Sequence, residues 1–190
     1  MRSPIVFFLA IALFSCAMRP ALAEGSATVP LVIEDFTMQP ETRWRFFTDQ
    51  VMGGVSTGSM TFVQENGSAF ARMTGSVSTA NRGGFIQIRL DLANAAPAGT
   101  TGLRLIVRGN TQRYFVHLRT SGTLLPWQYY QAGFDVSEDW REVRLPLSAF
   151  TASGALLADQ PNPDSLNSVA VVAYGRDHVA RIDVREVGFY

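Results

Sequence analysis

The sequence has no lysine, only one cysteine and only two histidines among its 190 residues. The single cysteine, Cys16, falls in a segment that we expect to be removed, so the mature chain has no thiol for a disulfide or a thiolate metal site. The two histidines, His117 and His178, lie far apart and form no zinc-ligand spacing. The core alone must therefore stabilise the domain, and the sequence predicts neither a metal nor a cofactor.

The sequence also lacks an excess of either charge. Lys plus Arg and Asp plus Glu both number 16, and loss of Arg2 and Arg19 with the N-terminal segment would leave the rest slightly acidic. Nucleic-acid-binding domains carry a clear basic excess. The composition therefore argues against a nucleic-acid partner.

The N-terminal apolar run, residues 5–14, is too short for a permanent membrane span. It follows Arg2 and precedes Ala21-Leu22-Ala23, which offers the small residues that a signal peptidase recognises. We therefore expect a signal peptide over residues 1–23, cleaved after Ala23, and a periplasmic or secreted protein with no integral membrane span. The segment ending at Cys16 also resembles a lipoprotein processing box, which leaves open a lipid anchor on that cysteine.

No stretch of helical apolar periodicity interrupts the remainder, which alternates short β segments with Gly, Asn, Pro and Ser. In one segment Ile86, Ile88 and Leu90 share a face opposite Gln87 and Arg89, which indicates one buried and one wet face. This pattern predicts an all-β fold, an antiparallel β-sandwich formed by a single domain over residues 28–190. The expected strands are 31–36, 59–63, 69–76, 84–92, 103–108, 114–120, 129–134, 140–145, 169–174 and 180–189.

A turn beginning at Gly109 is expected to fold residues 103–108 back onto residues 113–120 as a hairpin. In that register Arg104 lies opposite His117 on the outer side, where the two would form part of a ligand floor. A solvated face partly covered by a loop is the alternative.

Aromatic residues gather after Pro126, at Trp127, Tyr129 and Tyr130. Aromatic side chains clustered in a loop stack on sugar rings or anchor protein partners. They equally well close the end of a core, so both interpretations stay open.

Two glycine pairs sit at strand ends, where they permit sharp bends and close backbone approach. Together with Trp44, the predicted hairpin and the segment 140–147, they resemble the complex I intermediate-associated protein family. That family comprises the thirty-kilodalton assembly factor of mitochondrial NADH:ubiquinone oxidoreductase and its bacterial relatives. The most specific element of the resemblance is the string Asp-x-Val-Met-Gly-Gly-Val-Ser at residues 49–56, and the second pair is Gly83 and Gly84.

The resemblance implies a galactose-binding-like jelly roll without catalytic activity, which holds partners during assembly, respiratory-complex subunits among them. The mitochondrial members work in the matrix, whereas this chain is expected to be exported. Its functional loop is predicted at Asp49, Met52, Gly53, Gly54 and Ser56, although Asp49 could instead accept backbone N–H bonds in a purely structural role.

Two further sets of residues suggest other functions. Residues 54–58 match the Gly-x-Ser-x-Gly pattern of a serine hydrolase, but a strand rather than a helix is expected after Ser56. Glu34, Asp35 and Glu186 could supply oxygens to calcium, although no ligand spacing is recognisable. The sequence therefore favours a non-enzymatic module that holds a protein partner in the cell envelope, with glycan binding as the alternative.

Overall fold

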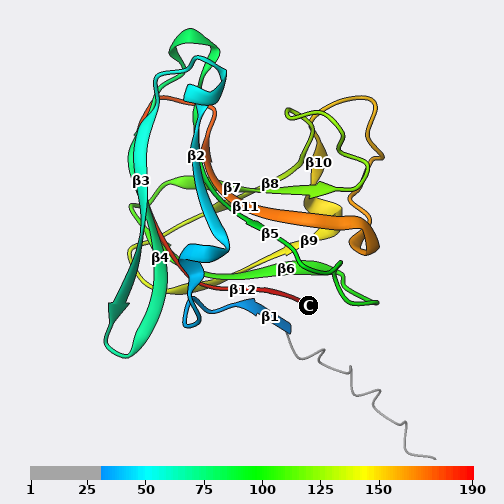
Figure 1. Cartoon of the computed structure of the whole chain (residues 1–190), viewed down its shortest axis with the longest axis horizontal. Helices are drawn as coiled ribbons and strands as arrows, with labels where there is room; N and C mark the ends of the chain where they lie inside the picture. Colours follow the sequence, from blue (N-terminus) through cyan, green and yellow to red (C-terminus); the bar gives the residue numbers. More distant parts are fainter. Residues whose placement is uncertain (1–30) are drawn as a thin grey trace, which may run out of the picture.

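The computed structural model describes residues 31–190 and shows two antiparallel sheets packed against each other (Figure 1). The predicted all-β sandwich is therefore confirmed. The predicted signal peptide and Cys16 lie outside the described residues. Within residues 31–190, no helix is long and apolar enough to cross a membrane.

The first sheet, here the β12 sheet, has the order β3-β4-β12-β6-β9. β4 pairs with the first part of β12, residues 178–184, and β1 pairs with its last residues, 187–189. Its strands are β1 (Leu31–Glu34), β3 (Thr57–Glu65), β4 (Ser68–Val77), β6 (Gly102–Gly109), β9 (Arg141–Pro146) and β12 (His178–Phe189).

The second sheet, here the β11 sheet, has the order β10-β8-β7-β11-β5-β2. Its strands are β2 (Trp44–Thr48), β5 (Phe85–Asp91), β7 (Arg113–Thr120), β8 (Tyr130–Asp135), β10 (Thr151–Ala152) and β11 (Leu166–Tyr174). Short 3-10 turns join the strands at η1 (Pro40–Thr42), η2 (Asp49–Met52), η3 (Ala80–Arg82), η4 (Leu147–Ala149) and η5 (Pro163–Ser165).

The core lies between the two sheets and consists of the inward half of each alternating strand. Ile86, Ile88 and Leu90 are buried, while Gln87 and Arg89 point to the other face and stay half-buried. The continuous apolar run of β11 is buried throughout, because β11 has β7 and β5 on either side. Burial, at about 25 cal/mol per Å² of apolar surface, is the main stabilising term, because residues 31–190 contain no cysteine for a disulfide.

The predicted hairpin does not form, because β6 and β7 belong to different sheets. β6 pairs with β12 and β9, whereas β7 pairs with β11 and β8. The three residues between them carry the chain from one sheet to the other, and Asn110 anchors this crossing through its side chain to the Val179 carbonyl. The alternation of apolar and polar residues indicates which face of a strand is buried, but it does not specify which strand lies next to it in the sheet.

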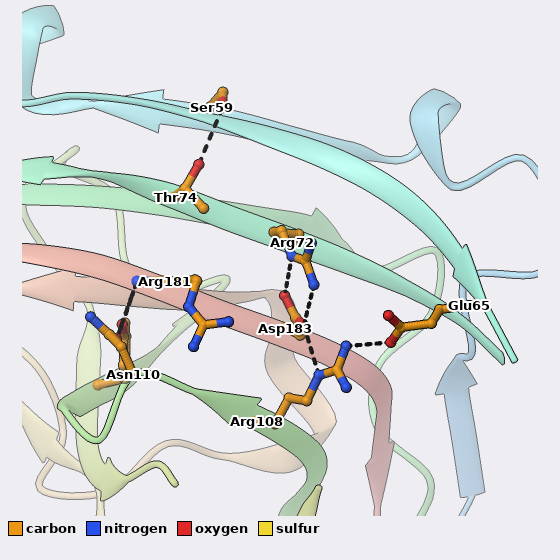
Figure 2. A network of polar contacts seen from close by, with 9 residues as sticks. Ser59, Glu65, Arg72, Thr74, Arg108, Asn110, Arg181 and Asp183 are labelled. Atoms are coloured by element: carbon orange, nitrogen blue, oxygen red, sulfur yellow. Dashed lines mark hydrogen bonds and ion pairs between the residues drawn. The ribbon is translucent and has the colours of Figure 1, made fainter. Parts of the chain in front are cut away.

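The outer face of the β12 sheet carries a second, smaller cluster in which aromatic rings and arginines alternate. Arg108 lies over the rings of both Phe70 and Trp140, at 5.1 and 4.6 Å. Asp183, 1% exposed, accepts hydrogen bonds from Arg72 and Arg108, and Arg108 also reaches Glu65 (Figure 2). The planar guanidinium groups thus cover Phe70, which is buried although it faces away from the main core.

Candidate ligand-binding groove

A groove of about 670 Å³ crosses the outer face of the β11 sheet. Strands β2, β5, β11 and β7 form its floor, and the loops at the two ends of these strands form its walls. Its lining residues are Phe47, Val51, Met52, Arg82, Gly83, Phe85, Gln87, Arg89, His117, Arg119, Pro126, Trp127, Gln128, Tyr129, Ser153, Ser168, Ala170 and Tyr174.

The depth of the groove follows from small side chains on its central strand. Ala170 on β11 lies between Arg89 on β5 and His117 on β7 in the sheet register. Ser168, two residues earlier on the same face, is also small. The longer side chains of the flanking strands therefore rise on either side of a low central strip.

One wall is the loop that joins β7 to β8. Arg119 holds this loop by donating hydrogen bonds to the carbonyl oxygens of Thr123, Leu125 and Pro126. The next residue, Trp127, is 66% exposed and lines the groove. Tyr129 lies flat on the His117 ring, with 3.9 Å between the ring centroids. This wall thus presents the exposed indole of Trp127 and the stacked ring of Tyr129 to the groove.

The His117 ring belongs to the floor and stays uncharged at neutral pH. Burial lowers the pKa of His117 to about 4, a shift that the hydrogen bond to Gln131 only partly offsets. The Nε2 atom lies 2.8 Å from the amide oxygen of Gln131, which assigns the proton to Nε2. The histidine therefore adds a hydrogen-bonding ring to the floor and no charge.

The opposite wall consists of η2 and the loop around η3, which lie side by side at one end of the sandwich (Figure 1). The buried carboxylate of Asp49 joins them, because it accepts hydrogen bonds from the Ser56 amide and hydroxyl and from the Gly84 amide. Burial opposes its charge, but these bonds hold the pKa of Asp49 below its ordinary value. We refer to this arrangement as the Asp49 clasp.

One glycine of each pair fits closely against the Asp49 clasp, which gives the string at residues 49–56 a structural reason. A Cβ on Gly54 would lie 2.3 Å from the Asp49 carboxyl carbon, and one on Gly83 would lie 2.3 Å from a carboxylate oxygen. No side chain fits at either position while the carboxylate stays in place. The clasp leaves Val51 and Met52 exposed on the groove wall.

Five of the predicted site residues line the groove: Met52, Gly83, His117, Trp127 and Tyr129. Asp49 and Ser56 have no exposed surface, and with Gly53, Gly54 and Gly84 they shape the wall rather than line it. The part that these residues play in binding a ligand stays a prediction.

Three predicted site residues lie elsewhere. Trp44 is in the core and donates its indole N–H to Glu34, and Tyr130 is a core residue as well. Arg104 pairs with Glu142 and Glu186 on the outer face of the β12 sheet, on the other side of the sandwich from His117. The prediction that Arg104 and His117 share a ligand floor is wrong, because it depended on the hairpin that does not form.

The geometry supports neither the serine-hydrolase nor the calcium-binding alternative. Ser56 stands directly before β3 rather than at a helix, and its hydroxyl bonds Asp49 and the backbone of Ser78. Glu34 binds Arg43 and Trp44, while Glu186 binds Arg104. Across residues 31–190, no group of three or more His, Cys, Asp or Glu side chains could hold a metal ion.

Several lining residues were not predicted, because the outward faces were considered only for the two strands of the expected hairpin. Phe47 lies on β2, which was not expected as a strand, and Gln87, Arg89, Arg119 and Tyr174 occupy wet-face positions. The sequence feature that could have indicated them is the recurrence of aromatic residues and arginines at the outward-facing positions of these strands.

Family comparison bears out the resemblance seen in the sequence. The family model described as "Complex I intermediate-associated protein 30 (CIA30)" matches residues 35–179. No curated protein sequence matches the chain significantly.

Structural comparison shows the jelly-roll fold of carbohydrate-binding modules. The family 11 carbohydrate-binding module of the cellulosomal cellulase Lic26A-Cel5E of Clostridium thermocellum aligns with a TM-score of 0.69 at 12% identity, over 86% of this chain and 95% of the module. The family 30 module of the cellulosomal cellulase Cel9D-Cel44B of the same organism aligns with a TM-score of 0.52 at 13% identity, over 72% and 90%. An exo-beta-agarase aligns with a TM-score of 0.59 at 6% identity, over 84% of this chain but 25% of the agarase.

Proposed function

This chain belongs to the complex I intermediate-associated protein 30 family, and we propose that it is a non-catalytic module that binds a glycan in the groove of the β11 sheet. The observation that carries the proposal is the exposed indole of Trp127 beside a floor that contains both apolar and polar side chains. A sugar ring has an apolar face that stacks on an aromatic ring and hydroxyl groups that need hydrogen-bond partners. The groove offers both, from Trp127 and from Gln87 and the arginines.

The size and rigidity of the groove support the same function. Its volume of about 670 Å³ lies within the range of about 300–1,000 Å³ that small-molecule sites occupy. Arg119 and the Asp49 clasp fix the two walls before any ligand arrives, which lowers the entropic cost of binding. The structure of the family 11 module has also been solved in complex with a β-1,3-1,4-mixed-linked tetrasaccharide. At such low sequence identity, the similarity to this module shows a shared fold and not a shared ligand.

Replacing Trp127 by alanine should weaken glycan binding at least tenfold, because removing an aromatic anchor from a site commonly costs about 2 kcal/mol or more. A glycan array identifies the ligand for the wild-type protein, and calorimetric titration then compares the variants. Leu124→Ala is the matched control, since Leu124 is 82% exposed in the same loop but does not line the groove. Absence of any glycan bound by the wild-type protein would contradict the proposed function.

A protein partner is the second candidate, favoured by the family and by three exposed apolar residues of the clasped wall. Val51, Met52 and Val55 are 73%, 63% and 46% exposed. Solvent-exposed apolar clusters of this kind mark interaction surfaces. Photo-crosslinking from position 55 in native envelopes separates the candidates, because recovery of respiratory-complex subunits supports a protein partner.

The proposed location is the cell envelope, through the predicted signal peptide. A fusion of residues 1–23 to a reporter that is active only after export should give activity, and Ala21 and Ala23 replaced by bulky residues should leave the fusion uncleaved. An inactive fusion would place the module in the cytoplasm instead.

A further inference from the structure

The groove is positively charged although the chain as a whole is neutral. Arg82, Arg89 and Arg119 are among its lining residues, and none of the lining residues is Asp or Glu. Lys plus Arg and Asp plus Glu are equal over the whole sequence. The excess is therefore a local feature of the groove.

Two of these arginines flank the small residues of the central strand. In the register, Arg89 lies beside Ala170 and Arg119 beside Ser168. Both arginines and Ser168 also line an adjoining hollow of about 430 Å³, which Asp91 lines as well. Burial lowers the pKa of Arg119, and the nearby charge of Arg89 lowers it further. Two like charges thus lie close together at one end of the groove.

Arg89 has a single ion-pair partner among the described residues. Its guanidinium lies 4.8 Å from the centre of the Phe47 ring. Its ion-pair partner is Asp91, whose side chain is 55% exposed, with 3.1 Å between Nε and the carboxylate oxygen. On the neighbouring strand β2, Arg45 lies opposite Arg89, so positive charge outweighs Asp91 here.

We infer, resting on the proposed glycan-binding function, that the ligand is an anionic glycan, with an acidic group on Arg89 and Arg119 and a sugar ring on Trp127. A guanidinium binds a carboxylate or sulfate through paired N–H donors, which gives both strength and orientation. A neutral sugar entering the groove would desolvate these arginines without compensating their charge.

The test is calorimetric titration of the wild-type protein with oligogalacturonate and with its methyl ester, which keeps the backbone and removes the charge. Oligogalacturonate should bind at least tenfold more tightly than the ester, and the preference should shrink as salt is raised. A sulfated dextran distinguishes the source of the anion, and binding of it in place of oligogalacturonate assigns a sulfated sugar.

Arg89→Gln should reduce oligogalacturonate affinity about tenfold or more and should reduce affinity for the methyl ester by a clearly smaller factor, because only the charged ligand loses an ion pair. Arg113→Gln is a closely matched control, since Arg113 also lies over a phenylalanine of this face and pairs with an aspartate, but does not line the groove. Circular dichroism checks that both variants remain folded.

The remaining outcomes separate this inference from the proposed function. Equal binding of oligogalacturonate and its ester, with dependence on Trp127, would overturn the anionic preference and leave glycan binding standing. Binding of polyglutamate without binding of any glycan would overturn both, and would assign the groove to an acidic protein segment.

Discussion

Replacing Gly54 by alanine should destabilise the domain by about 3 kcal/mol or more and abolish ligand binding in the groove. The new methyl group would lie 2.3 Å from the carboxyl carbon of Asp49. That carboxylate cannot move aside without breaking its bonds to Ser56 and Gly84. Overpacking of a well-filled site costs about 1–3 kcal/mol, and loss of buried hydrogen bonds adds to it.

The adjacent glycine provides the control. A Cβ on Gly53 meets nothing within 4 Å, so Gly53→Ala is penalised only by its φ of 88°. That penalty is about 1–2 kcal/mol. Urea denaturation of both variants measures the difference, and equal stability of the two would show that the Asp49 clasp does not constrain the loop.

Replacing Asp183 by asparagine should cost about 3–5 kcal/mol, because the change leaves the charges of Arg72 and Arg108 without their shared buried partner. The cluster that covers Phe70 would then open to water. Glu142→Gln is the control, since Glu142 also bridges two arginines but is 40% exposed. Exposed ion pairs contribute about 0–1 kcal/mol, so a similar loss in both variants would contradict the burial of Asp183.

The pH dependence of stability should report the same site. Burial raises the pKa of Asp183, but hydrogen bonds from Arg72 and Arg108 outweigh it and hold the pKa below the ordinary 3.8. The resulting stability is present above pH 3.8 and is lost as the pH falls through the lower, folded-state pKa. The asparagine variant should show less of this acid-dependent loss than the wild-type protein.

The sequence predicted the faces of the strands better than their neighbours. Leu105 and Val116, on the two strands of the expected hairpin, are both buried, but they belong to opposite sheets rather than pairing within one. A period of two reports burial, while pairing depends on contacts far apart in the chain. The short crossing after Gly109 therefore could not be told from a hairpin turn.

Only some of the residues that line the groove could be predicted from the sequence. Trp127 and Tyr129 stood out as loop aromatics, and Asp49 with its glycines stood out as a string. Arg89 and Tyr174, by contrast, lie about half the domain apart in the sequence and share the groove only because β5 pairs with β11. The link between the string and the groove wall likewise needed the hydrogen bonds of the buried carboxylate.

The most direct test of the account is nuclear magnetic resonance of the isotope-labelled protein titrated with oligogalacturonate and with its methyl ester. We expect one or both saccharides to shift the Trp127 indole signal and the amide signals of Tyr129, Gln87 and Ala170. Signals from the outer face of the β12 sheet around Asp183 should stay unchanged. Shifts confined to the β12 sheet, or no shift with either saccharide, would contradict it.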